Sequence, residues 1–394
     1  MLSLSRQIDI VLRVAKREVK MLLRRPVYIF STYFVMIFSC VFFLTLFKTG
    51  SPEKMPIAVV DLDHSSISRR VVHELNATQA VDIVAVTDTY EDARKLMQQG
   101  RVYAFVVVPD RFYADLASFK RPEVVFYTNN AYTIGANTAS KQLLTVMTLA
   151  SAAFQREVLR KKGLPDYMIM KRLQPIAIEE HFVGNPSSNY LVYLVGILLP
   201  GILGLIVLMI TIYTIGSELK WKTSRDWLRA AQGSFTRAMV GKLLPHLILY
   251  CTLGITMNIV MVKMMHFPIN GSFLWLNVGM VAYILAMQSI AVTFVGIIPI
   301  LRVALSAGAL YGMLAFSLSG FTFPKMGMLP FVQALTNIFP LRHYYLVYVN
   351  EVLFGNPITQ SLPSVAVLIA FTGLQMLIMR RLHRALLYQY FPKD

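Results

Sequence analysis

Long hydrophobic stretches without a Lys, Arg, Asp or Glu recur along this chain. The first covers residues 27–47. As a helix it would be about 31 Å long, enough to cross a hydrocarbon core of about 30 Å. Five comparable stretches follow, with approximate limits 189–215, 243–262, 273–300, 303–323 and 361–379. The pattern predicts a polytopic α-helical membrane protein with six transmembrane helices.

The start of the chain also has features of a signal peptide, since a basic segment precedes an apolar stretch. The stretch is too long for that, and residues 43–47 offer no small-residue cleavage site. We therefore expect an amphipathic helix over residues 1–26, followed by a retained first transmembrane helix.

Residues 48–188 have the pattern of a compact domain, because short apolar strands alternate with helical segments. We expect an inserted α/β domain with a mainly parallel sheet. Ser65 or Ser66 is the expected N-cap of the first helix, and Gly100 the C-cap of the second. The expected strands are 56–61, 81–86, 103–108 and 124–127, and the expected helices are 65–75, 88–99, 111–119 and 135–162.

Composition narrows the class of protein. Hydrophobic residues make up 56% of the 394 and charged residues 15%, against about 25% charged in an ordinary soluble domain. This excludes a disordered chain and disfavours a cytosolic enzyme. The net charge of +17 would suit a nucleic-acid-binding protein, so its distribution along the chain decides its meaning.

The excess of positive charge lies almost entirely on alternate connecting segments. Residues 1–26, 216–242, Arg302 and the tail from residue 380 together carry +13, whereas residues 48–188 have 17 basic and 15 acidic residues. The positive-inside rule then places both termini in the cytoplasm and the inserted domain outside. Since the basic residues flank apolar stretches, they predict contact with membrane lipid headgroups and no nucleic-acid partner.

Motifs for catalysis or metal binding are missing from the sequence. Gly241-Lys242 is the nearest fragment of a nucleotide-binding loop, but Thr236 stands where its first Gly belongs. Asp61 and Asp63 follow the first strand without a glycine-rich turn, so we interpret them as turn and cap residues. We expect no catalytic residue, no metal site and no cofactor bound by this chain.

The transmembrane stretches contain no Lys, Arg, Asp or Glu, and His246 is their one histidine. An ion-driven carrier, which usually keeps such groups as relays, is therefore disfavoured. If the protein moves a solute, the energy comes from elsewhere.

Two connecting segments suggest mechanical roles. Residues 216–242 include a short amphipathic charged segment, whose Trp221 and Trp227 we expect at the membrane interface or in the groove of a partner protein. Residues 324–357 contain two apolar helical pieces too short to cross a membrane, which predicts a re-entrant hairpin. Its breaks are set by Pro324, Pro330 and Pro340.

At these two segments the chain resembles the type-2 family of ATP-binding-cassette (ABC) exporter permeases. The outer pattern is Ser-Gly-Phe-x-Phe-Pro at residues 319–324, followed by Pro-Leu-x-His-Tyr at residues 340–344. The loop pattern is Glu218, Thr223 and Leu228, closed by Gly-Lys-x-x-Pro at residues 241–245. Lys222 replaces the usual Gly, and residues 232–233 are Gln-Gly where the family often has Thr-Pro.

The resemblance implies a transport subunit that is not itself an enzyme, in a bacterial inner membrane. A separate cytoplasmic ABC ATPase, carrying the ATP and Mg, would drive export. The other implied partners are a second copy or sibling permease, a periplasmic adaptor and an outer-membrane channel. The implied ATPase-coupling residues are Glu218, Lys222, Thr223, Arg225, Asp226, Trp227, Leu228 and Arg302. The implied pathway or exit-gate residues are Pro200, Gly201, Gly320, Phe321, Phe323, Pro324, Pro340, His343 and Tyr344.

The expected layout is therefore a first helix, an inserted domain, a five-helix region over residues 189–380 and a cytoplasmic tail over residues 381–394. The alternative function is a non-transporting membrane scaffold or signalling anchor, with ligand recognition in the inserted domain.

Overall fold

A computed structural model describes residues 4–50, 52–118, 120–161, 163–173, 181, 183–186 and 188–388. The chain divides into two compact units. Residues 1–50 and 182–394 form one, here called the helical unit, and residues 51–181 form the other, here called the insertion. The predicted ends at Phe119 and Lys162, and the last six residues of the predicted tail, lie outside the described residues.

The helical unit contains the six predicted spans, each long and apolar enough to cross a membrane. The first combines α2 (Pro26–Ile29), the π-helix η1 (Phe30–Phe34) and α3 (Val35–Leu46). The others are α9 (Tyr190–Lys220), α11 (Phe235–Ile259) with the π-helix η3 (Val260–Met264), α12 (Phe273–Ile297), α13 (Leu301–Leu318), and α16 (Ile358–Thr372) with α17 (Leu374–Tyr388).

Three of these helices extend beyond the apolar stretches. Helix α9 continues past residue 215, α11 begins before residue 243, and α17 runs through residues expected in the tail. The sequence-based limits stop at the first charged residue, whereas backbone hydrogen bonding does not. Glu218 and Lys242 lie in the added turns, and both side chains are buried.

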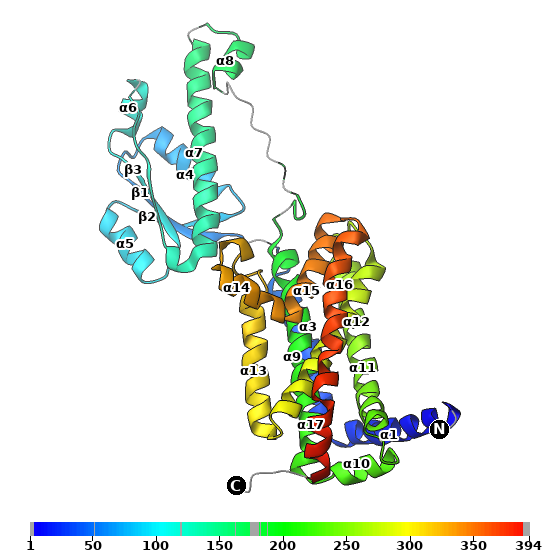
Figure 1. Cartoon of the computed structure of the whole chain (residues 1–394). Coiled ribbons are helices and arrows are strands. Elements are labelled where there is room, and N and C mark those ends of the chain that lie inside the picture. Colours follow the sequence, from blue (N-terminus) through cyan, green and yellow to red (C-terminus); the bar gives the residue numbers. More distant parts are fainter. Residues whose placement is uncertain are drawn as a thin grey trace. The chain divides into compact units, whose positions relative to one another are not determined.

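Helix α12 lies at the centre of the helical unit and packs against α9, α11, α16 and α17, while α13 packs on α9. Helix α1 (Leu4–Arg24) runs crosswise to the long helices and packs mainly on α11, next to the short helix α10 (Ser224–Ala230) (Figure 1). The end of the unit that contains α1 and α10 is called the α10 end below.

The opposite end, here called the hairpin end, carries the segment between α13 and α16. Its elements are η4 (Lys325–Gly327), α14 (Pro330–Leu335), η5 (Thr336–Ile338), α15 (Pro340–Tyr348) and the π-helix η6 (Val349–Phe354). Pro330 and Pro340 each occupy the first turn of a helix, where the missing N–H costs nothing. The helical pieces therefore begin where the prolines predict.

The insertion has a four-stranded sheet in the order β2-β1-β3-β4. Strand β1 (Met55–Asp61) pairs in parallel with β2 (Val81–Thr87) and β3 (Ala104–Val108), whereas β4 (Val125–Thr128) is antiparallel to β3. The helices are α4 (Ser66–Asn76), α5 (Tyr90–Gln98), α6 (Phe112–Ala117), α7 (Thr133–Lys161) and α8 (Asp166–Leu173).

Both faces of this sheet are covered by helices, as the alternating pattern predicts. Ile57 and Val106 pack with residues of α4 and α7, whereas Ala58 and Phe105 pack with residues of α5. Ser65 is the N-cap of α4, since its hydroxyl accepts a hydrogen bond from the Ser68 N–H.

Candidate functional site

A network of buried charges joins three helices at the α10 end. Lys242 of α11 lies at its centre, with Nζ 2.8 Å from Oε2 of Glu18 on α1 and 2.9 Å from Oε1 of Glu218 on α9. The exposed fractions of these residues are 0%, 1% and 1%. One cation therefore bridges two carboxylates away from water.

Lys242 supplies one positive charge for two carboxylates, and further groups stabilise the remaining negative charge. Arg17 donates to both oxygens of Glu218, at 2.9 and 3.2 Å, and Thr223 donates to the same carboxylate. Thr214 donates to Glu18 at 2.7 Å, and His246 Nε2 lies 3.1 Å from Oε1 of Glu18. Buried charges are stable only when paired and hydrogen-bonded in this way.

Helical spacing explains why these side chains meet. Thr214 and Glu218 are four residues apart on α9, and Lys242 and His246 are four apart on α11, so each pair occupies one face of its helix. Gly241 lets α1 approach α11, because a Cβ there would lie 2.9 Å from the Val11 carbonyl oxygen.

The electrostatics of Glu18 follow from this geometry. Burial alone raises the pKa of its carboxyl, but Lys242 and His246 outweigh burial and lower the pKa to about 2. Glu18 is therefore ionised at every physiological pH, and the network keeps its negative charge.

Trp227 corrects one expectation. It does not lie at the membrane interface or on a surface open to a partner, because its exposed fraction is 0%. Its Nε1 donates to the Ala238 carbonyl at 3.2 Å, and Lys242 Nζ lies 4.9 Å from the centre of its ring. Helix α10 folds back on α11, and this packing covers the indole. Trp221, in contrast, is 59% exposed.

The predicted coupling residues thus divide into two groups. Glu218, Trp227 and Leu228 are buried and hold α10 in place, and Thr223 is half-buried. Lys222, Arg225 and Asp226 are exposed on and beside α10, and Arg302 is exposed at the start of α13. Only this second group presents side chains at the surface of the helical unit.

The predicted gate residues at the hairpin end pack closely. The Phe321 side chain is buried and its carbonyl accepts from the Tyr193 hydroxyl at 2.9 Å. Tyr344 stacks on Tyr283 with ring centroids 5.3 Å apart, and His343 Nε2 lies 3.0 Å from the Asn337 carbonyl oxygen. Pro340 is buried as well.

The remaining members of that group lie apart from this packed set. Phe323 and Pro324 are exposed. Pro200 and Gly201 are buried within α9, where a Cβ on Gly201 would overlap the Phe316 ring of α13. Apart from Pro200 and Gly201, the predicted gate residues thus lie at the hairpin end, opposite to the predicted coupling residues.

Sequence reasoning missed Glu18, Lys242 and His246 as members of the network. In the sequence, Lys242 stands only in the fragment of a nucleotide-binding loop and in the Gly-Lys-x-x-Pro pattern at residues 241–245, and neither predicts an ion pair. A usable signal was present, because Glu218 and Lys242 each lie within one helical turn or two of an apolar stretch, where a charge needs a partner.

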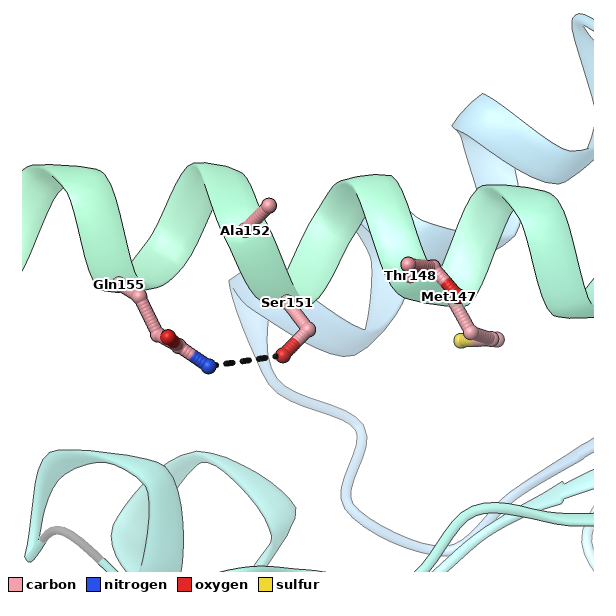
Figure 2. Close-up of a pocket in the computed structure, with 5 residues that line it drawn as sticks. All are labelled: Met147, Thr148, Ser151, Ala152 and Gln155. Atoms are coloured by element: carbon pink, nitrogen blue, oxygen red, sulfur yellow. Dashed lines mark hydrogen bonds between the residues drawn. The ribbon is translucent and has the colours of Figure 1, made fainter. Parts of the chain in front are cut away.

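The insertion contains no comparable site in its described part. Asp61 accepts hydrogen bonds from the Asp63 and His64 N–H groups and from the Ser68 hydroxyl, so it is a turn and cap residue as expected. A shallow pocket beside α7 is lined by residues of that helix alone, and the Gln155 side-chain amide donates to the Ser151 hydroxyl there (Figure 2). No cluster of three or more metal-ligating side chains occurs among the described residues.

Comparison with known protein families gave a match for most of the chain. A family described as ABC-2 family transporter protein matches residues 26–379. The match spans both units and supports transport over a scaffold. A comparison with curated protein sequences gave no match.

Proposed function

We propose a transport cycle from the premise that this chain belongs to the ABC-2 family of transporter proteins, as the membrane permease subunit of an ABC transporter. In this cycle the chain moves its substrate outward across a bacterial inner membrane. A separate cytoplasmic ATPase binds ATP and Mg and supplies the energy. This orientation rests on the positive-inside distribution of charge.

The observation that carries the proposal is the buried network at the α10 end. It fastens α1, α9 and α11 together through Lys242, Glu18 and Glu218. A partner that pushes on α10 therefore moves these helices as one body, because buried ion pairs resist separation. The network is a mechanical link and performs no chemistry on a substrate.

The docking surface for the ATPase is the exposed side of α10. Trp221, Lys222, Arg225 and Asp226 present a mixed charged and aromatic surface there, which suits a protein partner. Helix α1 packs against α10 and widens the surface. Arg302, exposed at the start of α13, belongs to the same docking face in our proposal.

The rest of the assembly follows from six spans forming half a pathway. Two copies, or this chain with a sibling permease, enclose the route, and Pro200, which lies inside α9, is beside it in our proposal. The hairpin end is the exit gate. The insertion then faces the periplasm, where it docks an adaptor that leads to an outer-membrane channel.

A photo-crosslinking experiment tests the docking surface. A photoreactive residue replaces Arg225 in the tagged full chain in native membranes, and crosslinked proteins are identified by mass spectrometry. We expect a protein with a Gly-x-x-x-x-Gly-Lys-Ser/Thr loop, because an ABC ATPase contacts α10. The same probe at Arg69, exposed in the insertion, is the control.

Purified chain without that partner should show no ATP hydrolysis, and activity should appear when the partner is added. Hydrolysis by the chain alone, or capture of the same ATPase at Arg69 and not at Arg225, would contradict the proposal.

A further inference from the structure

Arg342 is a buried cation at the hairpin end. It belongs to the first turn of α15, and 9% of its surface is exposed. Its Nη1 donates to the Ser319 carbonyl at 3.0 Å. Gly320 makes this approach feasible, since its φ is +87° and a Cβ there would overlap Nη1.

The other edge of this guanidinium has no partner among the described residues. Nε is buried without a hydrogen bond, and Nη2 makes none either. These two atoms form the edge with which arginine binds carboxylates and phosphates through two parallel hydrogen bonds. Buried donors are rarely left unpaired, because this costs stability, so the free edge points to a ligand.

The charge around Arg342 is positive. Burial, and then the charge of Arg342, lower the pKa of Lys325, whose Nζ lies 3.3 Å from Asn337 Oδ1. Burial also lowers the pKa of His343, so its ring adds no charge at neutral pH. No described carboxylate balances Arg342 or Lys325 electrostatically. An anion is the ligand that such a site favours.

The surface near these cations is strongly apolar. Phe323, Met326, Leu329 and Phe331 all lie between the end of α13 and the first turns of α14, and each is exposed. An inorganic anion would leave these side chains in contact with water. A molecule with an anionic head and an apolar body would satisfy both parts of the site.

We propose that Arg342 and Lys325 form a binding site for the oxyanion head of an amphiphile, with Arg342 as the two-bond anchor. The head is a phosphate or a carboxylate, and the body lies on the apolar hairpin surface. The site deepens the proposed function, since an amphiphile held at the exit gate is either a lipid of the bilayer or the exported molecule itself. Binding as such does not depend on the ATPase.

The test uses the full chain in nanodiscs of zwitterionic phosphatidylcholine, with phosphatidylglycerol as the probe. Native mass spectrometry after detergent release counts retained phosphatidylglycerol, and thermal unfolding measures the stabilisation it gives. We expect one lipid retained by the wild type and binding about tenfold weaker or more in Arg342→Gln, because a charge-assisted hydrogen-bond pair is lost. Arg342→Lys should restore little of the lipid binding, since an ammonium group cannot donate two parallel hydrogen bonds as a guanidinium does.

Lys325→Gln keeps the site testable if Arg342→Gln folds poorly, because Lys325 is half-buried on a short 3-10 turn. We expect it to weaken binding by a few-fold with an unchanged melting temperature in phosphatidylcholine alone. Arg94→Gln, which removes an exposed arginine on α5 of the insertion, is the matched control and should retain the lipid as the wild type does.

A second experiment distinguishes a resident lipid from the exported molecule. In it the reconstituted transporter is supplied with ATP and fluorescent phosphatidylglycerol. Movement of this lipid identifies the exported molecule, and retention without movement identifies a resident lipid; both support the site. Equal retention by the wild type, Arg342→Gln and Lys325→Gln would overturn it. Since retention is measured on the permease alone, a failure of ATPase coupling would leave this result unchanged.

Discussion

The two ends of the helical unit differ in how their buried cations are paired. At the α10 end, Glu18 and Glu218 are matched by Lys242, Arg17 and hydrogen bonds from neutral side chains. At the hairpin end, the described residues give Arg342 one carbonyl partner and leave the other edge of its guanidinium free. A compensated cluster holds helices together, and an uncompensated one has binding capacity left for another molecule.

This difference separates force transmission from recognition along the same helices. The α10 end gains rigidity because its buried charges are paired, and Lys242 serves both Glu18 and Glu218. In our proposal the hairpin end tolerates a donor that no described residue pairs, because a bound ligand accepts its hydrogen bond. The predictions below break one end while leaving the other unchanged.

Lys242→Met should have the largest effect. It leaves Glu18 and Glu218 buried near each other without their shared cation, which we expect to cost about 3–5 kcal/mol of stability. Thermal unfolding of the detergent-solubilised chain measures the loss. Lys220→Met, at the exposed last residue of α9, should change the melting temperature very little. Adding Glu18→Gln and Glu218→Gln to Lys242→Met should recover part of the loss; an unaltered melting temperature in Lys242→Met would refute the compensated network.

Acid should weaken the α10 end next. The pKa of Glu18 is near 4.5 in the unfolded chain and about 2 in the folded one. Its contribution, about 3 kcal/mol, is therefore fully present above pH 4.5 and is lost as the pH falls towards 2. Melting temperatures between pH 6 and pH 3 should fall less steeply in Glu18→Gln than in the wild type.

Asp9→Asn is the control for that series, since Asp9 is exposed on the same helix. Its slope should match that of the wild type. Equal slopes for all three chains would show that Glu18 titrates alike in the folded and unfolded states.

Trp227→Phe should cost about 2 kcal/mol, because it removes the indole donor to Ala238 and leaves a gap beneath Lys242. Trp221→Phe on the exposed side of the same loop should cost close to nothing. Chemical or thermal unfolding distinguishes the two. If Trp221→Phe proved the more destabilising change, the assignment of Trp227 to the core of the α10 end would be wrong.

Gly320→Ala addresses the hairpin end with the smallest change in stability. The positive φ costs an alanine about 1 kcal/mol, and the added Cβ displaces Arg342. Gly233→Ala bears similar backbone strain at φ +74° with nothing near its Cβ. Both variants should lose similar stability, but only Gly320→Ala should lose phosphatidylglycerol in native mass spectrometry. Retention of the lipid by both would separate Gly320 from the anion site.

Sequence patterns predicted much of the fold. Six uncharged stretches matched the six candidate spans because a membrane helix needs about 20 apolar residues, whatever its neighbours are. The strands of the insertion were predicted for a similar reason, since alternation of strand and helix is local. Ser65 illustrates this, because an N-cap depends on the next three residues only.

The candidate site was harder to predict, because it depends on residues far apart in the chain. Glu18 and Lys242 are 224 positions apart, and no local pattern indicates their pairing. Trp227 was misplaced because the amphipathic pattern of α10 identifies an apolar side without showing whether α11 or a partner covers it. Arg342 was part of a recognisable motif, yet its burial depends on the turn at Gly320.

The junctions of the insertion have a consequence for how this protein can be rebuilt. The Tyr190 N–H donates to the Gly50 carbonyl, and the Phe47 and Tyr190 rings lie 5.5 Å apart. The helical unit therefore holds both attachment points together, and the closure entropy of whatever chain joins them grows only slowly with its length. Gly50 and Tyr190 are therefore suitable junctions for domain exchange. A short linker or a foreign domain that joins them can replace the insertion while the six-helix frame is kept.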